Sequence, residues 1–358
     1  MKPLIVPFFI AHQGCPHQCV FCNQLKISGG SETVPTPAEL LDKIAAFRSY
    51  AKGRAMEAAF FGGTFTALPV SLQEQLLLPL QPLLASGGLS SVRVSTRPDA
   101  VDRRTAEFLR AMGVRTVELG VQSMDDAVLS RAGRGHTACD TVTACRLLAE
   151  AGLKVGAQLM PGLPGDTAET ALDTLKQTLA LKPDFLRIYP TLVIAGTELE
   201  RMYLRGEYLP LGLSEAVALC KVMLHLALRA SVPVVRVGLQ PTDELQAGGA
   251  VVAGPFHPAF RQLVEGELFF DLLVSLSADL PSRLPITLFC SPARLSDLAG
   301  QRRANILRFR RDREIEVVAL KPDPRLSPLE LRVETANFEL VGSLLGLNYP
   351  REDTPYAC

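Results

Sequence analysis

The sequence predicts an α/β fold with parallel strands, followed by a smaller α+β unit. Apolar runs of strand length alternate with segments of helical periodicity through the first two thirds of the chain. Such alternation requires crossover connections between parallel strands. After about Pro241 the alternation stops and the order of elements changes. We therefore predict one domain over residues 1–240 and a second over residues 241–358, since 358 residues suit one large and one small domain.

Seven short apolar runs are the predicted strands of the first domain. They are Leu4–Ile10, Ala58–Phe61, Val92–Thr96, Thr116–Val121, Lys154–Met160, Phe185–Tyr189 and Val234–Leu239. The predicted helices between them include Pro37–Tyr50, Leu72–Leu84, Arg103–Met112, Ala138–Ala151 and Thr167–Leu181. Periodicity alone leaves open whether the sheet is flat or closed into a barrel. In either form we expect the ligand site at the carboxyl ends of the strands, where loops vary over a rigid base.

Composition places the chain among folded proteins, because 47% of its residues are hydrophobic and 21% are charged. The formal net charge is zero, from 37 basic and 37 acidic residues, which excludes attraction of the whole molecule to nucleic acid or membrane. The apolar start, Met1–Ile10, is too short for a membrane span and lacks a signal-peptide cleavage site. We therefore expect a cytoplasmic protein without membrane association.

Three of the eight cysteines lie close together after the first predicted strand. They are Cys15, Cys19 and Cys22. Thiolates at this spacing suit an iron–sulfur cluster or zinc, and the scattered cysteines are expected in the core. Structural zinc usually has four ligands in two pairs, and no second pair exists, although His12, His17 or His136 could add a fourth ligand. Three thiolates on a four-iron cluster leave one iron free to bind a small molecule.

This cysteine segment resembles the cluster loop of the radical S-adenosylmethionine (SAM) superfamily. The resemblance implies a partial (β/α)6 barrel with a [4Fe–4S] cluster on the three cysteines and SAM at the free iron. An electron donor such as ferredoxin or flavodoxin would then drive cleavage of SAM into methionine and a 5′-deoxyadenosyl radical.

Polar residues and glycines at the ends of the predicted strands resemble the SAM-binding segments of this superfamily. The resemblance assigns to SAM the residues Gly62, Gly63, Thr64, Ser95, Arg97, Glu118, Gln122, Gln158 and Tyr189. Glycines allow the backbone to approach the methionine amino group, and Arg97 suits the carboxylate. Glu118 lies within an apolar run, so it is expected to bind a ribose hydroxyl or, alternatively, to form a structural ion pair.

Longer strings resemble the elongator catalytic subunits, a tRNA-modifying branch. They are Phe60–Thr66, Thr96–Asp99, Val117–Ser123, Arg134–Thr137 and Ile188–Ile194 with Gly196 and Thr197. With the cysteines, this resemblance covers residues 5–240. Oxygen-independent coproporphyrinogen III oxidases share the cysteine spacing but are a more distant match. Residues 241–358 show no glycine-rich turn for an acyl-CoA pyrophosphate, so acetyltransferase chemistry is not implied.

The second domain resembles a KH-type RNA-binding module in the order of its elements. The strand Leu284–Cys290 precedes a helix, the loop Gly300–Arg303, a basic helix from Ala304 and two further strands. Seven arginines and two aspartates from Arg294 to Arg313 give this stretch a net charge of +5. Ala304 follows the loop where the second glycine of a GxxG motif is expected, and a solvated basic helix is the alternative.

The leading hypothesis is a radical SAM enzyme that acts on RNA, with tRNA as the expected substrate. Arg302 and Arg303 are the candidate RNA contacts, and Arg134 and His136 are candidates for contact with SAM or the substrate. His257 is a candidate for the substrate side, with packing of its loop as the alternative. The first alternative is a radical SAM enzyme acting on a small molecule or a tetrapyrrole. A third possibility, from another class, is a non-catalytic module that holds zinc or an electron-transfer cluster.

Overall fold

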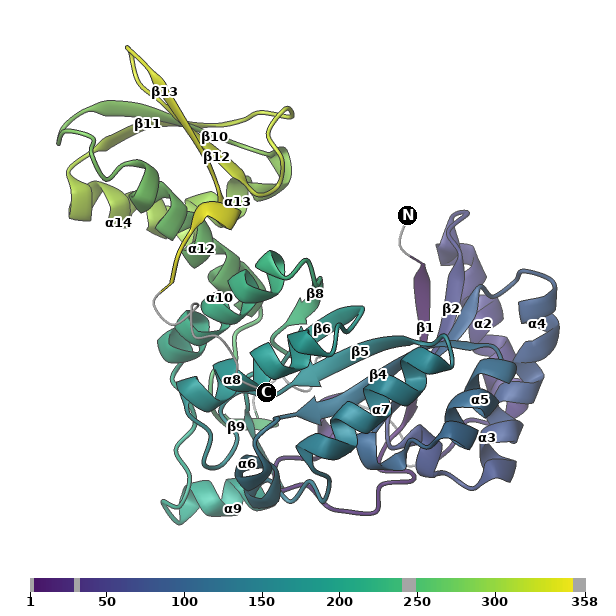
Figure 1. The fold of residues 1–358 in the computed structure, drawn as a ribbon. Coiled ribbons are helices and arrows are strands. Elements are labelled where there is room, and N and C mark those ends of the chain that lie inside the picture. Colours follow the sequence, from purple (N-terminus) through teal and green to yellow (C-terminus); the bar gives the residue numbers. More distant parts are fainter. Residues whose placement is uncertain (1–2, 29–32, 240–248, 350–358) are drawn as a thin grey trace. The chain divides into compact units, whose positions relative to one another are not determined.

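The computed structural model describes residues 3–28, 33–239 and 249–349 (Figure 1). The chain divides into two compact units, which we call the barrel unit and the second unit. The barrel unit comprises Met1–Leu211 and Val232–Phe256, and the second unit comprises Gly212–Ser231 and His257–Cys358. The sequence predicted a single boundary after residue 240, whereas α10 (Leu213–Arg229) groups with the second unit although it precedes the last barrel strand.

A curled sheet of seven parallel strands forms the barrel unit, in the order β1-β2-β3-β4-β5-β6-β8. Its strands are β1 (Leu4–Ile10), β2 (Met56–Gly62), β3 (Ser91–Thr96), β4 (Val114–Gln122), β5 (Lys154–Leu159), β6 (Phe185–Ile188) and β8 (Val234–Val237). All seven predicted strands are confirmed. Because β1 and β8 are edges, the barrel is open, and β8 adds a seventh strand to the six that the resemblance implied.

The helices of the barrel unit cover the outer face of the curled sheet (Figure 1). They include α2 (Pro37–Ala51), α3 (Val70–Leu77), α4 (Gln81–Ala85), α5 (Arg103–Ala111), α7 (Ala138–Glu150) and α8 (Ala168–Ala180). Thr36 and Thr137 begin α2 and α7 with reciprocal capping bonds to the third residue of each helix. The single helix predicted over 72–84 is instead two, because Pro79 and Pro82 cannot donate the backbone hydrogen bonds of a continuous helix.

Side chains alternate along the strands between this helix layer and the inner face of the sheet. In β3, Val92 and Val94 are fully buried, while Arg93 and Ser95 are only partly buried and point to the opposite side. The polar inner face therefore surrounds a space that the helices do not fill.

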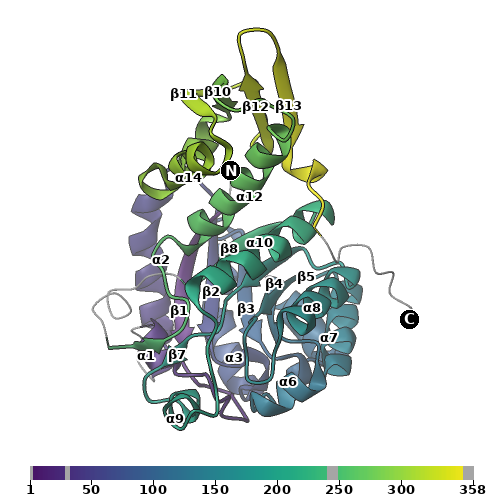
Figure 2. The same ribbon diagram turned by 90° about the vertical axis from the view of Figure 1, so that its left-hand side faces the viewer.

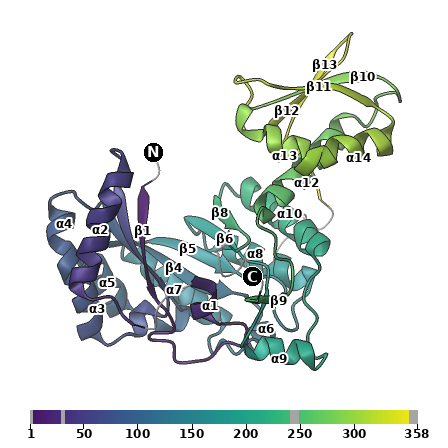
Figure 3. The ribbon, with the colours of Figure 1, turned by 180° about the vertical axis from the view of Figure 1, so that it is seen from behind.

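Short elements lie where the strands end at their carboxyl termini. They are α1 (Gln24–Ser28), α6 (Asp126–Arg131), α9 (Glu198–Leu204), and the antiparallel pair β7 (Val193–Ile194) and β9 (Val251–Ala253). Figure 2 shows α6, α9 and β7 at the same end of the unit. Figure 3 shows, from behind, the segment between β1 and α1 running along this end. The candidate site is thus framed at the carboxyl ends of the strands, as predicted.

The second unit is an α+β layer pair. Its sheet has the order β11-β10-β12-β13, in which β10 and β11 are parallel and the other pairs antiparallel. The elements besides α10 are α12 (Phe260–Leu276), β10 (Pro285–Cys290), α13 (Leu295–Ala299), α14 (Ala304–Arg313), β11 (Glu316–Pro322), β12 (Glu330–Glu334) and β13 (Glu339–Ser343). Phe269, Leu288 and Phe309 are buried in its core. Among the described residues, no helix has the length and apolar character that a membrane crossing requires.

Candidate functional site

A cavity of about 710 Å³ lies inside the curl of the barrel unit, at the carboxyl ends of the strands. Every residue assigned to the cluster or to SAM from the sequence lines this one cavity, and so does Arg134. These residues come from the segment after β1 and from the ends of β2 to β6. The structure thus brings together side chains that are up to about half the chain apart in sequence.

Residues 11–22, which we call the cysteine loop, are bound to the turn that follows β2. The backbone N–H of Gly63 donates to the carbonyl of Ile10 at 3.1 Å, and that of Thr64 donates to the carbonyl of Gln13 at 2.8 Å. The two segments therefore form one hydrogen-bonded block, although almost forty residues of α1 and α2 and their linkers separate them.

Two further segments hold the cysteine loop from the other side. The N–H of Val20 donates to the carbonyl of Ala132 at 3.1 Å, and the carbonyl of Val20 accepts from the N–H of Leu199 at 2.7 Å. Phe21 is buried in the same apolar cluster as Cys19, Val128 and Leu199. The end of α6 and the start of α9 thus hold the cysteine loop at Val20.

Two glycines are required by this close packing. A Cβ at Gly63 would lie 2.2 Å from the carbonyl oxygen of Gln13 and 2.5 Å from that of Ile10. At Gly14, where φ is +70°, a Cβ would lie 2.4 Å from the carbonyl oxygen of Thr64. Backbone atoms cannot yield as a flexible side chain does, so only glycine fits at either position.

The three cysteine thiols are unpaired by disulfides and lie in distinct local environments. The Sγ of Cys15 is 3.3 Å from the Thr64 hydroxyl, and the Sγ of Cys19 accepts from Arg134 Nη1 at 3.3 Å. Burial, and then the neighbouring Cys19 and Cys15, raise the pKa of Cys22 to about 12. Binding of a metal centre would favour the thiolate of Cys22, because the positive charge of the metal offsets these effects.

The spacing of the ligands bears on which metal centre the loop fits. Within the described ranges, no three or more His, Cys, Asp or Glu side chains are grouped closely enough to hold a metal ion. In a four-iron cluster each cysteine binds a different iron, so the sulfurs are farther apart than ligands around one ion. Cys15, Cys19 and Cys22 share the cavity with His12 and His17, but no such set is grouped closely enough for one ion within the described ranges, so the thiols suit a cluster better than structural zinc.

Two buried guanidinium groups line the cavity with donors that no protein atom satisfies. Arg97 pairs with both carboxylate oxygens of Asp99 at 2.9 Å, and Arg134 donates to the carbonyl of Gly120 at 2.6 Å. Arg97 Nη1 and Arg134 Nε are buried without a partner in the described part of the chain. An unsatisfied buried donor costs about 1–3 kcal/mol. A ligand carboxylate, such as that of SAM, would satisfy both groups.

An irregularity in β4 positions the amide groups of Gln122 and Gln158. The register of β4 with β5 shifts between Leu119 and Gln122, and Gln122 has a φ of +67°. Bulges of this kind redirect side chains next to binding sites. Gln158 Nε2 donates to Gln122 Oε1 at 3.2 Å, which leaves the Gln122 amide nitrogen for a ligand.

A chain of alternating charges crosses the inner face of the sheet, and two of its members, Glu118 and Arg187, line the cavity. Arg93 pairs with Glu57 at 2.8 Å and with Glu118 at 2.7 Å, and Arg187 pairs with the same oxygen of Glu118 at 2.8 Å. Burial lowers the pKa of Arg93, but the two carboxylates outweigh this effect and raise it above its usual value. Glu118 lines the cavity, but both of its partners are arginines. This arrangement matches the structural ion pair, which was the alternative to the expected contact with a ribose hydroxyl.

Glu57 and Arg93 were not among the residues predicted for the site, whereas Arg187 begins a segment, Arg187–Pro190, that resembles the sixth-strand segment of the superfamily. The position of the two arginines could have been inferred from the sequence, because side chains two residues apart in a strand point to the same face of the sheet. Arg93 is two residues before Ser95, and Arg187 is two residues before Tyr189, so both should point to the side of the predicted site residues.

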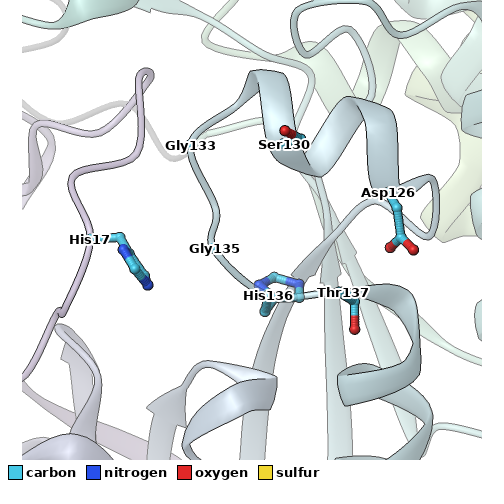
Figure 4. Close-up of a pocket in the computed structure, with 7 residues that line it drawn as sticks. All are labelled: His17, Asp126, Ser130, Gly133, Gly135, His136 and Thr137. Carbon is cyan, nitrogen blue, oxygen red and sulfur yellow. The ribbon is translucent and has the colours of Figure 1, made fainter.

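His136 lies outside the main cavity, in a neighbouring pocket of about 370 Å³ shown in Figure 4. His17 reaches this pocket from the cysteine loop, while Asp126 and Ser130 belong to α6. Burial, and then Arg134 and Arg97, lower the pKa of His136 to about 4. The ring is therefore neutral at pH 7, and its Nε2 lies 3.2 Å from the carbonyl of Val121. Of the two candidates on this loop, only Arg134 faces the cavity with the cysteines.

The remaining candidates belong to the second unit. His257 Nδ1 accepts from the N–H of Ala259 at 3.0 Å, so this histidine orders the chain before α12. Arg302 and Arg303 are exposed in the loop between α13 and α14, with φ values of +52° and +63°. Neither makes an ion pair with any residue that the structure describes.

The charge of +5 predicted for residues 294–313 is reduced by a neighbouring helix. Arg294 pairs with Glu265 and Arg308 pairs with Glu267, both on α12. Two acidic residues outside the basic stretch thus neutralise part of its charge. As far as the described residues show, the arginines of this stretch without an acidic partner are Arg302, Arg303, Arg310 and Arg313, and Arg313 donates only to the carbonyls of Ser277 and Ala278.

Comparisons with known proteins agree with this geometry. Residues 9–178 match the Radical SAM superfamily model, and residues 183–269 match the model of the Radical_SAM C-terminal domain. Together with the curled parallel sheet and the cysteine loop, these matches show that the chain belongs to the radical SAM superfamily. It is a radical SAM enzyme, whose cofactors are a [4Fe–4S] cluster and SAM.

Within this superfamily the chain resembles the elongator catalytic-subunit branch. It is 31% identical over 253 residues to the tRNA uridine(34) acetyltransferase of Methanocaldococcus jannaschii, covering 60% of this chain and 47% of that protein. It is 31% identical over 192 residues to human Elongator complex protein 3, covering 48% of this chain and 35% of that protein. The chain thus spans about half or less of the length of these relatives.

A solved structure supports the same placement. The structure of archaeal Methanocaldococcus infernus Elp3 with residues 1–46 deleted matches with a TM-score of 0.59 and 25% sequence identity. The match covers 74% of this chain and 62% of that one.

Proposed function

We propose that this enzyme modifies RNA, and tRNA in particular, with SAM bound in the 710 Å³ cavity. The observation that carries the SAM site is that three cysteines and two incompletely satisfied buried arginines line one cavity. When bound, the cluster and SAM supply the 5′-deoxyadenosyl radical. The RNA substrate is supported by the names of the relatives and by the exposed arginines between α13 and α14.

Each residue that the sequence assigned to the cluster or to SAM has a role in this proposal. Cys15, Cys19 and Cys22 hold the cluster, and Arg97 with Arg134 binds the carboxylate of SAM. The backbone of Gly62, Gly63 and Thr64 faces its amino group, while Ser95, Gln122, Gln158 and Tyr189 surround the adenosine. Glu118 keeps Arg93 and Arg187 in place beside this site.

Anaerobic reconstitution with iron and sulfide tests the cofactor site. We expect the reduced protein to give a four-iron electron paramagnetic resonance signal that changes on addition of SAM, together with formation of 5′-deoxyadenosine. Cys19→Ala is expected to lose the signal, because three thiolates hold the cluster. Cys139→Ala is the matched control, since Cys139 is exposed and remote from the trio in sequence. Tightly bound zinc with no SAM cleavage would instead support the non-catalytic alternative.

Reversal of charge tests RNA binding by the second unit. In Arg302→Glu/Arg303→Glu, we expect tRNA affinity to fall by about tenfold or more in a gel-shift titration, because phosphate contacts are replaced by repulsion. Arg103→Glu/Arg104→Glu changes the net charge equally on exposed residues at the start of α5 and should bind nearly as wild type. Equal binding by both double variants would remove the KH-like interpretation, while iron content checks that the cluster is retained.

We further propose that the enzyme works in the cytoplasm with ferredoxin or flavodoxin as electron donor. The seven cysteines that the structure describes are all free thiols, which suits a reducing compartment. A low-potential donor is needed there because the cluster must be reduced before SAM is cleaved.

A further inference from the structure

The charges on the inner face of the barrel sheet do not balance. Glu57 and Glu118 are matched by Arg93 and Arg187, as described above. Arg236 on β8 is the next residue in register, opposite Arg187, and it also lines the cavity. Arg236 is half-buried and forms no ion pair with any residue in the described ranges. Among the residues that the structure describes, this side of the cavity therefore carries a cation without a counter-charge.

Arg187, the neighbour of Arg236 in the sheet, has a hydrogen-bond donor that lacks a partner among the described residues. Its Nη2 binds Glu118 and its Nη1 lies 3.3 Å from the Tyr189 hydroxyl, but its Nε is buried without a partner among the described residues. Buried donors normally have a hydrogen-bond partner. We therefore expect a ligand in the cavity to accept a hydrogen bond from Arg187 Nε, or to move the guanidinium so that this nitrogen finds an acceptor.

Aromatic side chains line the same cavity from the first two strands. Phe9 on β1 is 37% exposed, and its ring lies 6.3 Å from that of Phe61 on β2, at an interplanar angle of 42°. The guanidinium of Arg187 lies 5.3 Å from the centre of the Phe61 ring. A phenylalanine that is exposed to a cavity gains nothing from contact with water, so its ring is available for contact with a flat ligand group.

We infer that this part of the cavity is a subsite for one unpaired nucleotide of the RNA substrate. Phe9 and Phe61 contact the base, and Arg236 binds its phosphate. Proteins bind single-stranded RNA by this combination of aromatic rings for bases and cations for phosphates. In the proposed function the carboxylate of SAM is bound by Arg97 and Arg134 beside the cysteine loop, so Arg236 is left for a second anionic group. The inference rests on the proposed action on RNA.

The first experiment measures binding of a fluorescein-labelled tRNA transcript to the full-length, cluster-containing protein at several salt concentrations. Arg236→Gln is expected to weaken binding by about tenfold and to reduce the slope of log affinity against log salt by about one, as for one lost phosphate contact. Phe9→Leu is expected to weaken binding by about fivefold or more without changing the slope, because stacking is not ionic. Arg103→Gln, an exposed arginine on α5, is the control for charge.

Folding and the SAM site are checked separately in each variant. Circular dichroism and the change of the paramagnetic signal on adding SAM should match wild type, since neither Arg236 nor Phe9 is assigned to the cluster or to SAM. If wild type binds tRNA but both variants keep its affinity and its salt slope, the subsite is wrong while the action on RNA stands.

A second experiment separates RNA from a free phosphate-bearing ligand. Equilibrium dialysis compares the four 5′-mononucleotides with the matching nucleosides and with inorganic phosphate. The phosphate contact is supported if mononucleotides bind more strongly than nucleosides and this difference is lost in Arg236→Gln. If wild type shows this binding but no affinity for tRNA, the proposed action on RNA fails and the subsite belongs to a small nucleotide. Equal binding of nucleosides and nucleotides would overturn the phosphate contact.

Discussion

Gly63→Ala is expected to abolish assembly of the cluster. The added Cβ would collide with the carbonyl oxygens of Gln13 and Ile10, at 2.2 and 2.5 Å, and neither can move without displacing the cysteine loop. Overpacking against flexible side chains costs about 1–3 kcal/mol, and rigid backbone on both sides places this variant at or above the upper end. Iron and sulfide content after reconstitution, with the paramagnetic signal, would measure the loss.

Gly346→Ala is the matched control for this prediction. Gly346 has no heavy atom within 4 Å of an added Cβ, and like Gly63 it does not require a left-handed backbone conformation. This control variant should take up a full complement of iron. A Gly63→Ala protein with normal iron content and normal SAM cleavage would show that the cysteine loop is not held by the turn after β2.

Arg93→Met is expected to destabilise the barrel unit by about 3–5 kcal/mol. Glu57 would lose its cationic partner and keep only the Ser91 hydroxyl at 2.9 Å, while Glu118 would keep Arg187. Removing one member of a buried ion pair leaves an uncompensated charge, which is more costly than removing the pair. Urea denaturation followed by circular dichroism would give the free energy of unfolding.

Two comparisons isolate the electrostatic origin of this effect. Arg103→Met breaks an exposed ion pair with Glu150 and should change the free energy of unfolding by about 0–1 kcal/mol. Adding Glu57→Gln to Arg93→Met should recover part of the stability, since the unpaired carboxylate is then neutral. If the double variant is as unstable as Arg93→Met, lost packing of the arginine over Phe185 explains the effect instead.

Local sequence patterns predicted the strands and the residues that line the cavity. Strand alternation and helix caps are set by neighbouring residues, so all seven barrel strands could be located from the chain alone. The cysteines were identified by their close spacing, and the Gly62-Gly63 turn by its resemblance to a SAM-binding segment at the end of a strand. Parallel strands carry such loops to one edge of the sheet.

Features that depend on distant segments could not be predicted in this way. The partners of Glu118 come from β3 and β6, and the neutralisation of the arginines near α14 comes from α12. The grouping of α10 with the second unit likewise depends on which surface it packs against. The division of the predicted helix 72–84 could have been predicted from the sequence, because it is caused by Pro79 and Pro82 and not by a distant segment.

The hydrogen bonds around the cysteine loop also set an order of events during synthesis. The cysteines leave the ribosome among the first residues, but Val20 finds its partners only at Ala132 and Leu199. More than half of the chain must therefore be translated before the loop can take its final form. The final position of the cysteine loop is thus a property of the folded barrel unit as far as α9, and not of the segment around the cysteines alone.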